Sequence, residues 1–590
     1  MSFADLRSTR KDKESKSFVS ASGDNGPRSE AQQTADRVEN DTDSDIHSGI
    51  DEKPTVLSIK PAGLPPSVNV RKTATRGRGV YATSAFLPGS VISSLRPRVM
   101  ALSTSALSSY CSNCSGPPSP GAELKRCTRC RTVWYCDTDC QNKDWLSHKQ
   151  ECDALQRWAA APPFADIPIP SDAIRCLTRI IWMRKKKGPD SEFMNEWNML
   201  QSHKGSLPPA ASGSYTHLAF SVVRYIGASS YADLAPYGLS SAGDLVDLIS
   251  RFTTNSFTLT SPSLDPLGVC VSPTFALVNH SCEPNAVLVF PRASSNKVQE
   301  PQMQLVVIRP IAPEEEILTS YVDITSPRDI RRRALSETYK ITCECSLCRK
   351  PTHLDLRQSM TCPKACGGTC PLPLKDSDLV RCNECSAVVR ATDAVLDALR
   401  VGQEALDKAS ALQFKDPAKS LQLTTNILPI LISAGLTPSS HPVLALTRLH
   451  QELLIATFTR DLIQDVLDRT VRAAASYATG VSSLLTYGHP VRATALAELG
   501  KLLAVDEIAR ADPPSGIHYP PSGPERLRLA YTTLLEAVKE LQVGFGKPNE
   551  GGSIGKEVRE TLVRLEKELG VWTQGIRDAL RDQRLAGASK

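Results

Sequence analysis

No stretch of this 590-residue sequence approaches the roughly 20 consecutive apolar residues that a membrane-spanning helix needs. The best stretch, residues 421–436, is interrupted by threonine, asparagine, proline and serine. The first residues also lack the apolar core of a secretory signal, so we expect neither a membrane protein nor a secreted one. Hydrophobic residues make up 41% of the sequence and charged residues 22%, which is ordinary for a chain that forms several domains.

The first sixty residues have almost no aromatic side chains. They contain nine lysine and arginine residues, twelve aspartate and glutamate residues, and many serines. Such a segment cannot bury enough apolar surface to offset its ordering entropy, so we predict a disordered tail. The basic residues Arg10, Lys11 and Lys13 are interpreted as part of this solvated tail rather than as a nuclear signal.

The 18 cysteines indicate metal sites rather than disulfides in a chain without a secretory signal. Eight predicted ligands lie in four closely spaced pairs: Cys111 and Cys114, Cys127 and Cys130, Cys136 and Cys140, and His148 and Cys152. Tetrahedral zinc takes four nitrogen or sulfur ligands, so eight ligands predict two ions. Because the segment has little apolar core, zinc must supply its folding free energy, on the order of 10–16 kcal/mol per ion. With every position filled by a protein ligand, both sites are predicted to be structural.

A polar heptapeptide, residues 279–285, follows an apolar run and carries a single cysteine, Cys282. Downstream lie Tyr321, Tyr339 and a cysteine trio in residues 343–348 that lacks a fourth ligand. The trio consists of Cys343, Cys345 and Cys348. If Cys282 completes this site, the heptapeptide comes to lie against the two tyrosines. Alternatively, Cys282 is a buried thiol, and water or His353 completes a local site; spacing alone leaves both readings open.

A further cysteine cluster predicts one more zinc site. Five cysteines surround a Gly-Gly pair: Cys362, Cys366, Cys370, Cys382 and Cys385. One of them is surplus in a four-ligand site. We expect Cys362, Cys366, Cys382 and Cys385 to bind the ion and Cys370 to be the spare.

The formal charge of +6 is weak evidence for nucleic-acid binding. The three zinc sites predicted with most support contain eleven thiolates, which add eleven negative charges to the chain. Three zinc ions add six positive charges, so the corrected net charge is about +1. The basic cluster Lys185 to Lys187 is interpreted as a solvated helix face, and DNA binding is kept as a third functional possibility.

Hydrophobic patterning divides the rest of the chain into β-rich and helical regions. Short strands are expected in residues 67–95 and 251–325, and helices in residues 156–250 with a break at 205–214. Beyond residue 390 the pattern is helical, and His441-Pro442 and His489-Pro490 are predicted to open helices. Stacked helical hairpins and an ordinary bundle fit this spacing equally well.

Two groups of motifs resemble known domains. The cysteine and histidine spacing of residues 111–152, with Trp134-Tyr135-Cys136, resembles a MYND zinc finger. Residues 76–80 (Arg-Gly-Arg-Gly-Val), the Asn-His-Ser-Cys-Glu-Pro-Asn heptapeptide, Tyr321 and the cysteine trio together resemble a SET domain with a post-SET zinc site. A SET domain split by a MYND finger resembles the SMYD family of protein lysine methyltransferases.

The resemblance implies an α+β fold in which a β-rich SET domain is split by the finger and a helical insert, followed by a post-SET zinc site and an all-helical, TPR-like C-terminal domain. The implied segments are 1–60 (tail), 61–106 (first SET part), 107–155 (MYND finger), 156–250 (helical insert), 251–326 (SET core), 327–350 (post-SET region), 351–390 (zinc-ribbon-like knuckle) and 391–590 (helical domain).

The resemblance also implies ligand sets and residue roles. In the finger it pairs Cys111, Cys114, Cys136 and Cys140 on one ion, and Cys127, Cys130, His148 and Cys152 on the other. Tyr321 would be the catalytic tyrosine, and Tyr339 would line the channel for the substrate lysine. Six residues would contact the cofactor: Gly77, Arg78, Gly79, Asn255, Asn279 and His280. The sequence departs from the family in Ala312-Pro313, where glycine is usual, and Arg78 occupies a variable position.

The implied function is methyl transfer from S-adenosylmethionine to lysine residues of histone or other proteins, in the nucleus or cytoplasm, by a monomer that binds three or four zinc ions. The finger would bind a proline-rich peptide. The alternative is a scaffold or transcriptional regulator with a degenerate SET domain, and calorimetry of cofactor binding separates the two.

Overall fold

The structure is a computed structural model that describes most of the chain. The described residues are 55–56, 61–73, 76–163, 167–188, 190–206, 209–294, 296–349, 354–373, 375, 378–459, 462–508 and 519–588. The predicted disordered tail, residues 1–60, lies outside the described residues except for the short strand β1 (Thr55–Val56). Across these ranges, no helix has the length and hydropathy of a transmembrane segment.

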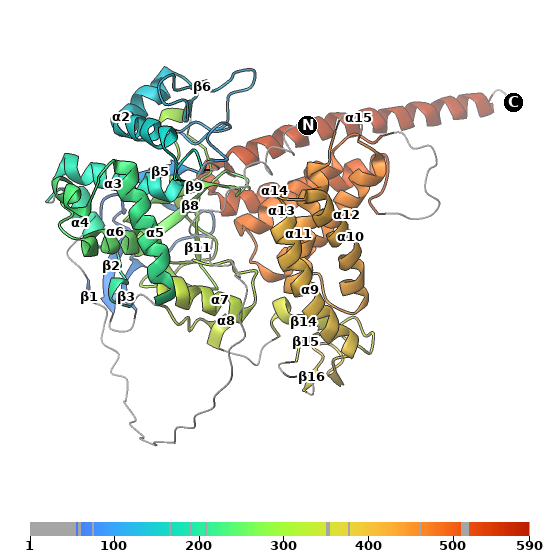
Figure 1. Cartoon of the computed structure of the whole chain (residues 1–590). Coiled ribbons are helices and arrows are strands. Elements are labelled where there is room, and N and C mark those ends of the chain that lie inside the picture. Colours follow the sequence, from blue (N-terminus) through green and yellow to red (C-terminus); the bar gives the residue numbers. More distant parts are fainter. Residues whose placement is uncertain are drawn as a thin grey trace.

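Three antiparallel sheets, each of three described strands, form the β-rich part of the molecule (Figure 1). Their strand orders are β1-β2-β3, β11-β12-β4 and β5-β9-β8. The bounds are β2 (Val68–Thr73), β3 (Gly77–Ala82), β4 (Val91–Leu95), β5 (Val99–Leu102), β8 (Ser256–Thr260), β9 (Pro266–Val271), β11 (Ala286–Val289) and β12 (Met303–Val307). The two regions predicted as strands therefore meet, because β4 pairs with β12 and β5 pairs with β9.

A short parallel pair brings the motif residues together. Strand β10 (Asn279–His280) pairs with β13 (Leu318–Thr319), so that Asn279 lies opposite Leu318. Next to it, the Ile317 N–H donates to the Val80 carbonyl over 2.8 Å, which joins β13 to β3. The Gly-Arg-Gly segment of β3, the heptapeptide and the segment before Tyr321 consequently occupy adjacent positions.

The finger and the helical insert lie between β5 and β8 in the sequence. Their elements are β6 (Lys125–Arg126), β7 (Trp134–Tyr135), α2 (Thr138–Ala160), α3 (Asp172–Lys187), α4 (Glu192–Asn198), α5 (Pro209–Ile226) and α6 (Ala242–Asn255). Helix α3 is buried from Asp172 to Trp182 and packs on β5 and β9. The predicted break at 205–214 is partly wrong: α5 already begins at Pro209, a residue tolerated in a first helical turn.

The segment after the sheets carries short elements. They are α7 (Arg328–Ala334), a π-helical turn (Leu335–Tyr339), α8 (Ser346–Arg349), β14 (Ser359–Thr361), β15 (Thr369–Pro371), β16 (Leu379–Arg381) and β17 (Val388–Arg390). Strands β14 and β15 form one hairpin-like pair, and β16 and β17 form another. These pairs hold the cysteine cluster of residues 362–385.

Helices occupy the C-terminal part. They are α9 (Asp393–Leu412), α10 (Pro417–Ser433), α11 (His441–Ala456), α12 (Gln464–Leu484), α13 (Pro490–Leu503), α14 (Pro524–Gly544) and α15 (Gly552–Ala588). Each helix packs on the next, as stacked hairpins do, and two separate apolar cores run along the array. The predicted helix starts at His441-Pro442 and His489-Pro490 are confirmed, with His489 as the N-cap of α13.

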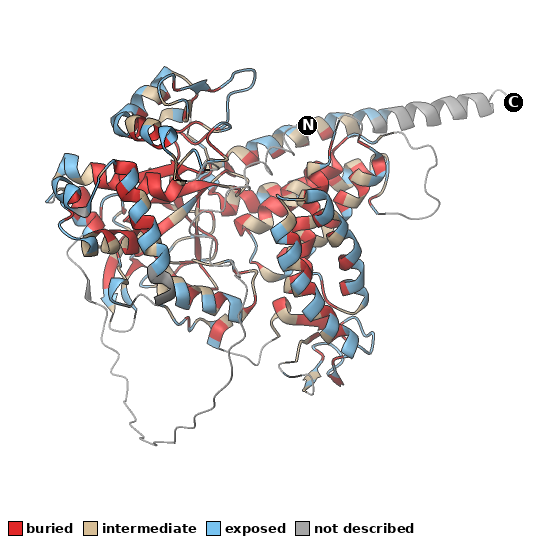
Figure 2. Cartoon of the chain, in the orientation of Figure 1, coloured by how far each residue is buried: buried red, intermediate tan, exposed pale blue. Residues whose placement is uncertain are grey.

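The helical array sits on the sheet β11-β12-β4. Val287, Val289 and Val306 share an apolar core with helices α11 to α15. At the edge of this contact, the Lys547 N–H donates to the Gly89 carbonyl over 2.8 Å. Figure 2 shows the buried residues gathered inside the β-rich part and inside the helical array.

His489 at this junction makes stability depend on pH. Its Nδ1 accepts the Val491 N–H over 3.3 Å, and burial lowers the pKa of His489 to about 4. The unfolded chain takes up this proton near pH 6.5 while the folded chain does not, so stability falls as the pH drops from 6.5 towards 4. We expect this histidine to contribute a loss of about 2 kcal/mol between pH 7 and pH 5.

Denaturant unfolding of wild type and His489→Asn at pH 7 and pH 5 measures this contribution. Asparagine retains a helix-capping acceptor but does not titrate. The difference between the two proteins isolates His489, because contributions of the zinc ligands are common to both. The wild type should lose more stability on acidification than the variant; equal losses would contradict the assignment.

Candidate functional site

Four groups of cysteine and histidine side chains in the described residues are compact enough to bind a metal ion. In each group all ligand atoms lie within 4.8 Å of one another. The groups are Cys111, Cys114, Cys136 and Cys140; Cys127, Cys130, His148 and Cys152; Cys282, Cys343, Cys345 and Cys348; and Cys362, Cys366, Cys382 and Cys385. Four sulfurs, or three sulfurs and an imidazole, are the donors of tetrahedral zinc, so these are four candidate zinc sites.

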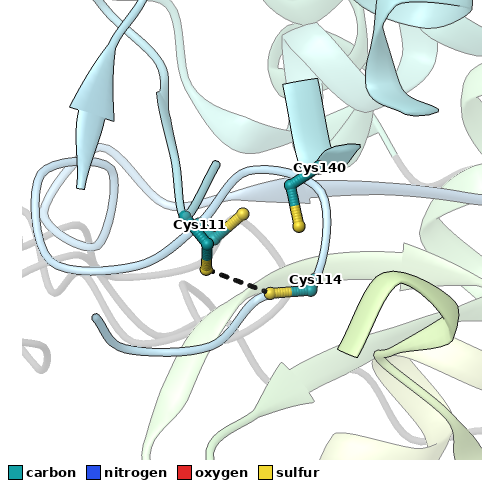
Figure 3. Close-up of side chains that lie close together, drawn as sticks. Cys111, Cys114 and Cys140 are labelled. Atoms are coloured by element: carbon teal, nitrogen blue, oxygen red, sulfur yellow. Dashed lines mark hydrogen bonds between the residues drawn. The ribbon is translucent and has the colours of Figure 1, made fainter. Parts of the chain in front are cut away.

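The first two groups interleave along the finger. Figure 3 shows the sulfur atoms of Cys111, Cys114 and Cys140 directed toward one another. In the second group, Cys130 Sγ lies 3.6 Å from His148 Nε2. Each group combines two of the four ligand pairs of the sequence: the first and third pairs form one group, and the second and fourth pairs form the other. This is the arrangement that the resemblance to a MYND finger implies.

A buried carboxylate supports the histidine ligand, and sequence reasoning missed it. Glu151 is fully buried, and its Oε2 lies 3.4 Å from His148 Nδ1 and forms an ion pair with Arg179 of α3. Burial alone would raise the pKa of Glu151, but Arg179 and His148 hold it below its ordinary value. Such a carboxylate fixes the orientation of a zinc-bound imidazole. The i, i+3 spacing of His148 and Glu151 on one helix was the available signal.

The third group joins the heptapeptide to the cysteine trio. Cys282 Sγ lies 3.6 Å from Cys348 Sγ and 4.0 Å from Cys343 Sγ. The structure thus brings Cys282 to the trio, while His353, the alternative ligand, lies outside the described residues. As a consequence His280 contacts Tyr321, whose backbone N–H donates to His280 Nδ1 over 3.1 Å.

Arg331 of α7 is a second buried residue that sequence reasoning missed. It is 1% exposed, and its Nη1 donates to the Ser326 carbonyl, while Nε and Nη2 have no hydrogen-bond partner in the described part of the chain. Burial opposes its charge, yet Cys282 and Cys348 beside it raise its pKa. Four thiolates around one zinc ion carry a net charge of −2, which a buried guanidinium offsets. In the sequence, Arg331 is hidden within a run of arginines typical of a surface.

The fourth group lies between the two strand pairs of residues 359–390. Cys362 follows β14 and Cys382 follows β16, and the two solvent-facing ligands are Cys366 and Cys385. Cys370, the expected spare, lies in β15 opposite Met360, is fully buried and is outside the group. Its role is packing.

A cavity of about 620 Å³ opens beside the third group, between the β-rich part and the start of α13. Six of the eight residues predicted as catalytic or cofactor-binding line it: Gly77, Arg78, Asn255, Asn279, Tyr321 and Tyr339. Gly79 and His280 are not part of the lining. The cavity therefore gathers residues from positions 77 to 339 of the chain.

The two tyrosines meet at one wall of the cavity. Their ring centroids are 4.8 Å apart, and the Tyr321 hydroxyl donates to the Val278 carbonyl over 2.7 Å. Burial raises the pKa of both hydroxyls. Both tyrosines are therefore neutral at physiological pH and act as hydrogen-bonding groups, not as bases.

Asn279 is held by its neighbours in a fixed orientation. Its Nδ2 donates to the Arg78 carbonyl over 3.0 Å and to Glu316 Oε1 over 2.7 Å. Glu316 in turn pairs with Arg76 over 2.6 Å. The amide oxygen of Asn279 remains as an acceptor for a ligand. Glu316 was another residue missed from the sequence, because its role depends on the contact of β13 with β3.

The remaining predicted cofactor residues differ in what they offer. Asn255 donates through Nδ2 to the carbonyls of Gln201 and Arg251, which again leaves its amide oxygen as an acceptor. Arg78 brings a guanidinium to the cavity, although burial lowers its pKa. His280 packs behind the cavity, with Nδ1 facing Tyr321 and Nε2 lying 3.4 Å from Cys282 Sγ, so that its side chain is used within the protein.

Gly79 is a sensitive position. A Cβ atom there would lie 2.4 Å from Glu316 Oε1 and 2.9 Å from Asn279 Nδ2. We expect Gly79→Ala to displace both side chains and to cost about 1–3 kcal/mol of stability. Thermal unfolding against Gly205→Ala, where a Cβ meets nothing within 4 Å, checks this. Equal melting temperatures for the two variants would contradict the proposed contact.

Comparison with known proteins places the chain among relatives with related domains. Residues 111–152 match the MYND finger family. The chain is 28% identical over 279 residues to the histone-lysine N-methyltransferase SMYD3 of Mus musculus, covering 47% of this chain and 60% of that protein. It is 28% identical to the N-lysine methyltransferase SMYD2 of Gallus gallus (46% and 58%) and to the histone-lysine N-methyltransferase ASHR1 of Arabidopsis thaliana (48% and 55%).

The chain thus spans less than two thirds of the length of these relatives. Among solved structures, the SET domain of LSMT bound to lysine and AdoHcy aligns with 87% of this chain and 90% of its own, at 12% identity and a TM-score of 0.31.

Proposed function

We propose that this chain, a SET and MYND domain protein of the SMYD type, methylates lysine side chains of proteins with S-adenosylmethionine as methyl donor. Three curated relatives in the aligned region are named as lysine methyltransferases. The observation that carries the proposal is the cavity in which Tyr321, Tyr339, Asn279 and Arg78 meet beside the third zinc group.

The polar groups around the cavity suit the methionine part of this donor. S-adenosylmethionine supplies an electrophilic methyl group on a positively charged sulfur. Arg78 would hold a carboxylate, and the amide oxygens of Asn279 and Asn255 would accept hydrogen bonds from an ammonium group. The two asparagines already donate through Nδ2, so acceptor atoms are what they offer. Gly79 and the backbone of His280 would complete this end of the site from behind.

The same cavity would prepare the substrate lysine. A lysine amine attacks only when neutral, and at pH 7 deprotonation of a free lysine costs about 4.6 kcal/mol. Apolar and aromatic side chains, among them Phe257, Leu277 and Tyr339, line the cavity and would lower the pKa of the amine by desolvation. Burial raises the pKa of both tyrosines, so they stay protonated and neither would take the proton from the amine.

Tyr321 would act by orientation. Its hydroxyl is fixed by the Val278 carbonyl and its backbone by His280, which is anchored beside Cys282. Through this chain of contacts, the third zinc group sets the position of a hydroxyl in the cavity wall. Alignment of reacting groups is a large part of the barrier reduction available to a displacement reaction.

Transfer of a tritiated methyl group from S-adenosylmethionine to core histones and to a protein array, by the zinc-loaded full chain, tests the proposal. Label recovered as methyl-lysine is expected. If a folded, zinc-loaded protein neither transfers label nor binds the donor in calorimetry, the chain is a scaffold with a degenerate catalytic domain.

The finger would serve as a partner-binding module. Leu146 is 76% exposed and Trp145 39% exposed on α2, outside the two candidate zinc sites. An exposed apolar pair on a rigid helix suits a proline-rich peptide.

We propose further that the enzyme acts as a monomer in the nucleus or cytoplasm, on histones or other proteins.

A further inference from the structure

A second, smaller cavity adjoins the first. It has a volume of about 290 Å³ and is lined mainly by residues of helices α9, α11 and α12. Asp323 and Thr325 line both cavities, and they follow Tyr321 by two and four residues. The two cavities are therefore adjacent at Asp323 and Thr325, and a polypeptide whose lysine occupied the larger one could place a second side chain in the smaller one.

The charges around the smaller cavity leave an excess of carboxylates. Its arginine, Arg448, is already bound to two carboxylates: Nε pairs with Glu452 over 2.7 Å and Nη2 with Glu498 over 3.2 Å. The guanidinium also lies over the Tyr477 ring, with 5.2 Å to its centroid. Glu498 lies outside the lining, so Asp323 and Glu452 are the carboxylates of the cavity wall, against the one guanidinium of Arg448.

In the described part of the chain, no other group near this cavity reverses its excess of negative charge. Burial lowers the pKa of His441, which therefore carries no charge at neutral pH, and Asp407 on α9 adds a further carboxylate near it. Burial raises the pKa of Tyr477 to about 12, so its hydroxyl is neutral. Lys408, the next residue on α9, is exposed and does not line the cavity.

The walls suit a long side chain. Leu406, Leu444 and Leu449 form apolar surface within the cavity, whereas Asp323 and Glu452 provide oxygen atoms. Lysine and arginine combine these needs, because their methylene stems pack on apolar surface while the charged end seeks carboxylates. A volume near the lower bound of ligand pockets, about 300 Å³, admits one such side chain.

We propose that the smaller cavity receives a basic side chain, arginine or lysine, from the same polypeptide whose lysine is methylated. The cavity would select substrates with a basic residue at a fixed distance from the target lysine. This inference rests on the proposed function, and it assigns Glu452 and Asp323 as specificity-determining residues.

A set of short peptides tests the inference, each with one lysine and one arginine at a different distance from it. Matched peptides carry citrulline, which is uncharged, in place of arginine. Methyl transfer by the wild type should favour arginine about tenfold at one spacing. Glu452→Gln and Asp323→Asn should each reduce this preference to about twofold, and added salt should weaken it in the wild type.

Glu404→Gln is the matched control, because Glu404 is an exposed carboxylate on α9 that pairs with Arg400 and does not line the cavity. Fluorescence anisotropy with peptides that carry norleucine in place of lysine measures binding without methyl transfer. The proposed function is decided separately, by label transfer to core histones and the protein array, and the binding measurement decides the inference even if no peptide is methylated. Equal affinity for arginine and citrulline peptides at every spacing, or an unchanged preference in Glu452→Gln, would overturn it.

Discussion

Replacing Tyr321 with phenylalanine should lower the rate constant for methyl transfer about 100-fold or more while leaving the fold intact. The substitution removes one hydroxyl that donates to the Val278 carbonyl over 2.7 Å and leaves the ring in contact with Tyr339. Loss of one preorganised hydrogen-bonding group in a desolvated site typically costs a factor of 10²–10³ in rate. Single-turnover transfer of labelled methyl groups measures the effect.

Tyr339→Phe provides the matched comparison. It removes the hydroxyl of the neighbouring ring, for which the proposed role is to line the lysine channel. We expect it to act mainly on the KM for the protein substrate, with a smaller change in kcat. Equal rates for wild type and Tyr321→Phe, with unchanged melting temperatures, would remove Tyr321 from its proposed role.

Replacing Cys282 with serine should release one zinc ion per chain and abolish methyl transfer. Cys282 is the ligand that joins the heptapeptide to the trio, and only three of the four sulfurs of this group remain without it. Structural zinc contributes on the order of 10–16 kcal/mol of folding free energy in small zinc domains. The free energy lost with the ion should therefore exceed the free energy that local packing contributes. Mass spectrometry of the native protein should give four zinc ions for the wild type and three for the variant.

Cys370→Ala is the control for this experiment. Cys370 is fully buried but belongs to none of the four groups, so the variant should keep four zinc ions and lose only packing energy. Hydrogen exchange locates the damage: Cys282→Ser should expose residues 327–350 and the Tyr321 segment. Four zinc ions in Cys282→Ser, or three in Cys370→Ala, would contradict the ligand assignment.

Local spacing explains why the metal groups were foreseeable. The ligands of the finger are close in sequence and paired on turns and one helix, so their metal-binding role can be predicted from the short spacing between them. Cys282 was different: it lies 61 residues before Cys343, and tertiary contacts such as the pairing of β10 with β13 bring the two segments together. Without the resemblance to SET domains, the sequence left that ligand undecided.

The supporting residues could not be read from local patterns. Glu316 acts on Asn279 from the segment before β13, and Arg331 lies beside cysteines of two separate segments. The ring nitrogens of His280 face Tyr321 and Cys282, which leaves its backbone for the predicted cofactor contact. In the turn where family members usually carry glycine, Glu314 itself adopts a φ of +70° and pairs with Arg71. Each of these depends on tertiary contacts that no short motif encodes.

The stacking of the C-terminal helices was likewise open in the sequence. Apolar spacing on α14 and α15 fits a bundle as well as stacked hairpins. The structure favours stacked hairpins over a single bundle, because each helix contacts the next one in the sequence and two apolar cores form. This array also supplies wall residues of the smaller cavity, so its topology would bear on substrate choice if the proposed role of that cavity holds.

Calorimetric titration of the zinc-loaded full chain with S-adenosylhomocysteine tests the central claim most directly. If the cavity bounded by Arg78, Asn279 and Tyr321 is the donor site, one molecule should bind per chain, and Asn279→Ala should weaken binding about tenfold. A folded protein with four zinc ions that shows no binding would contradict the account.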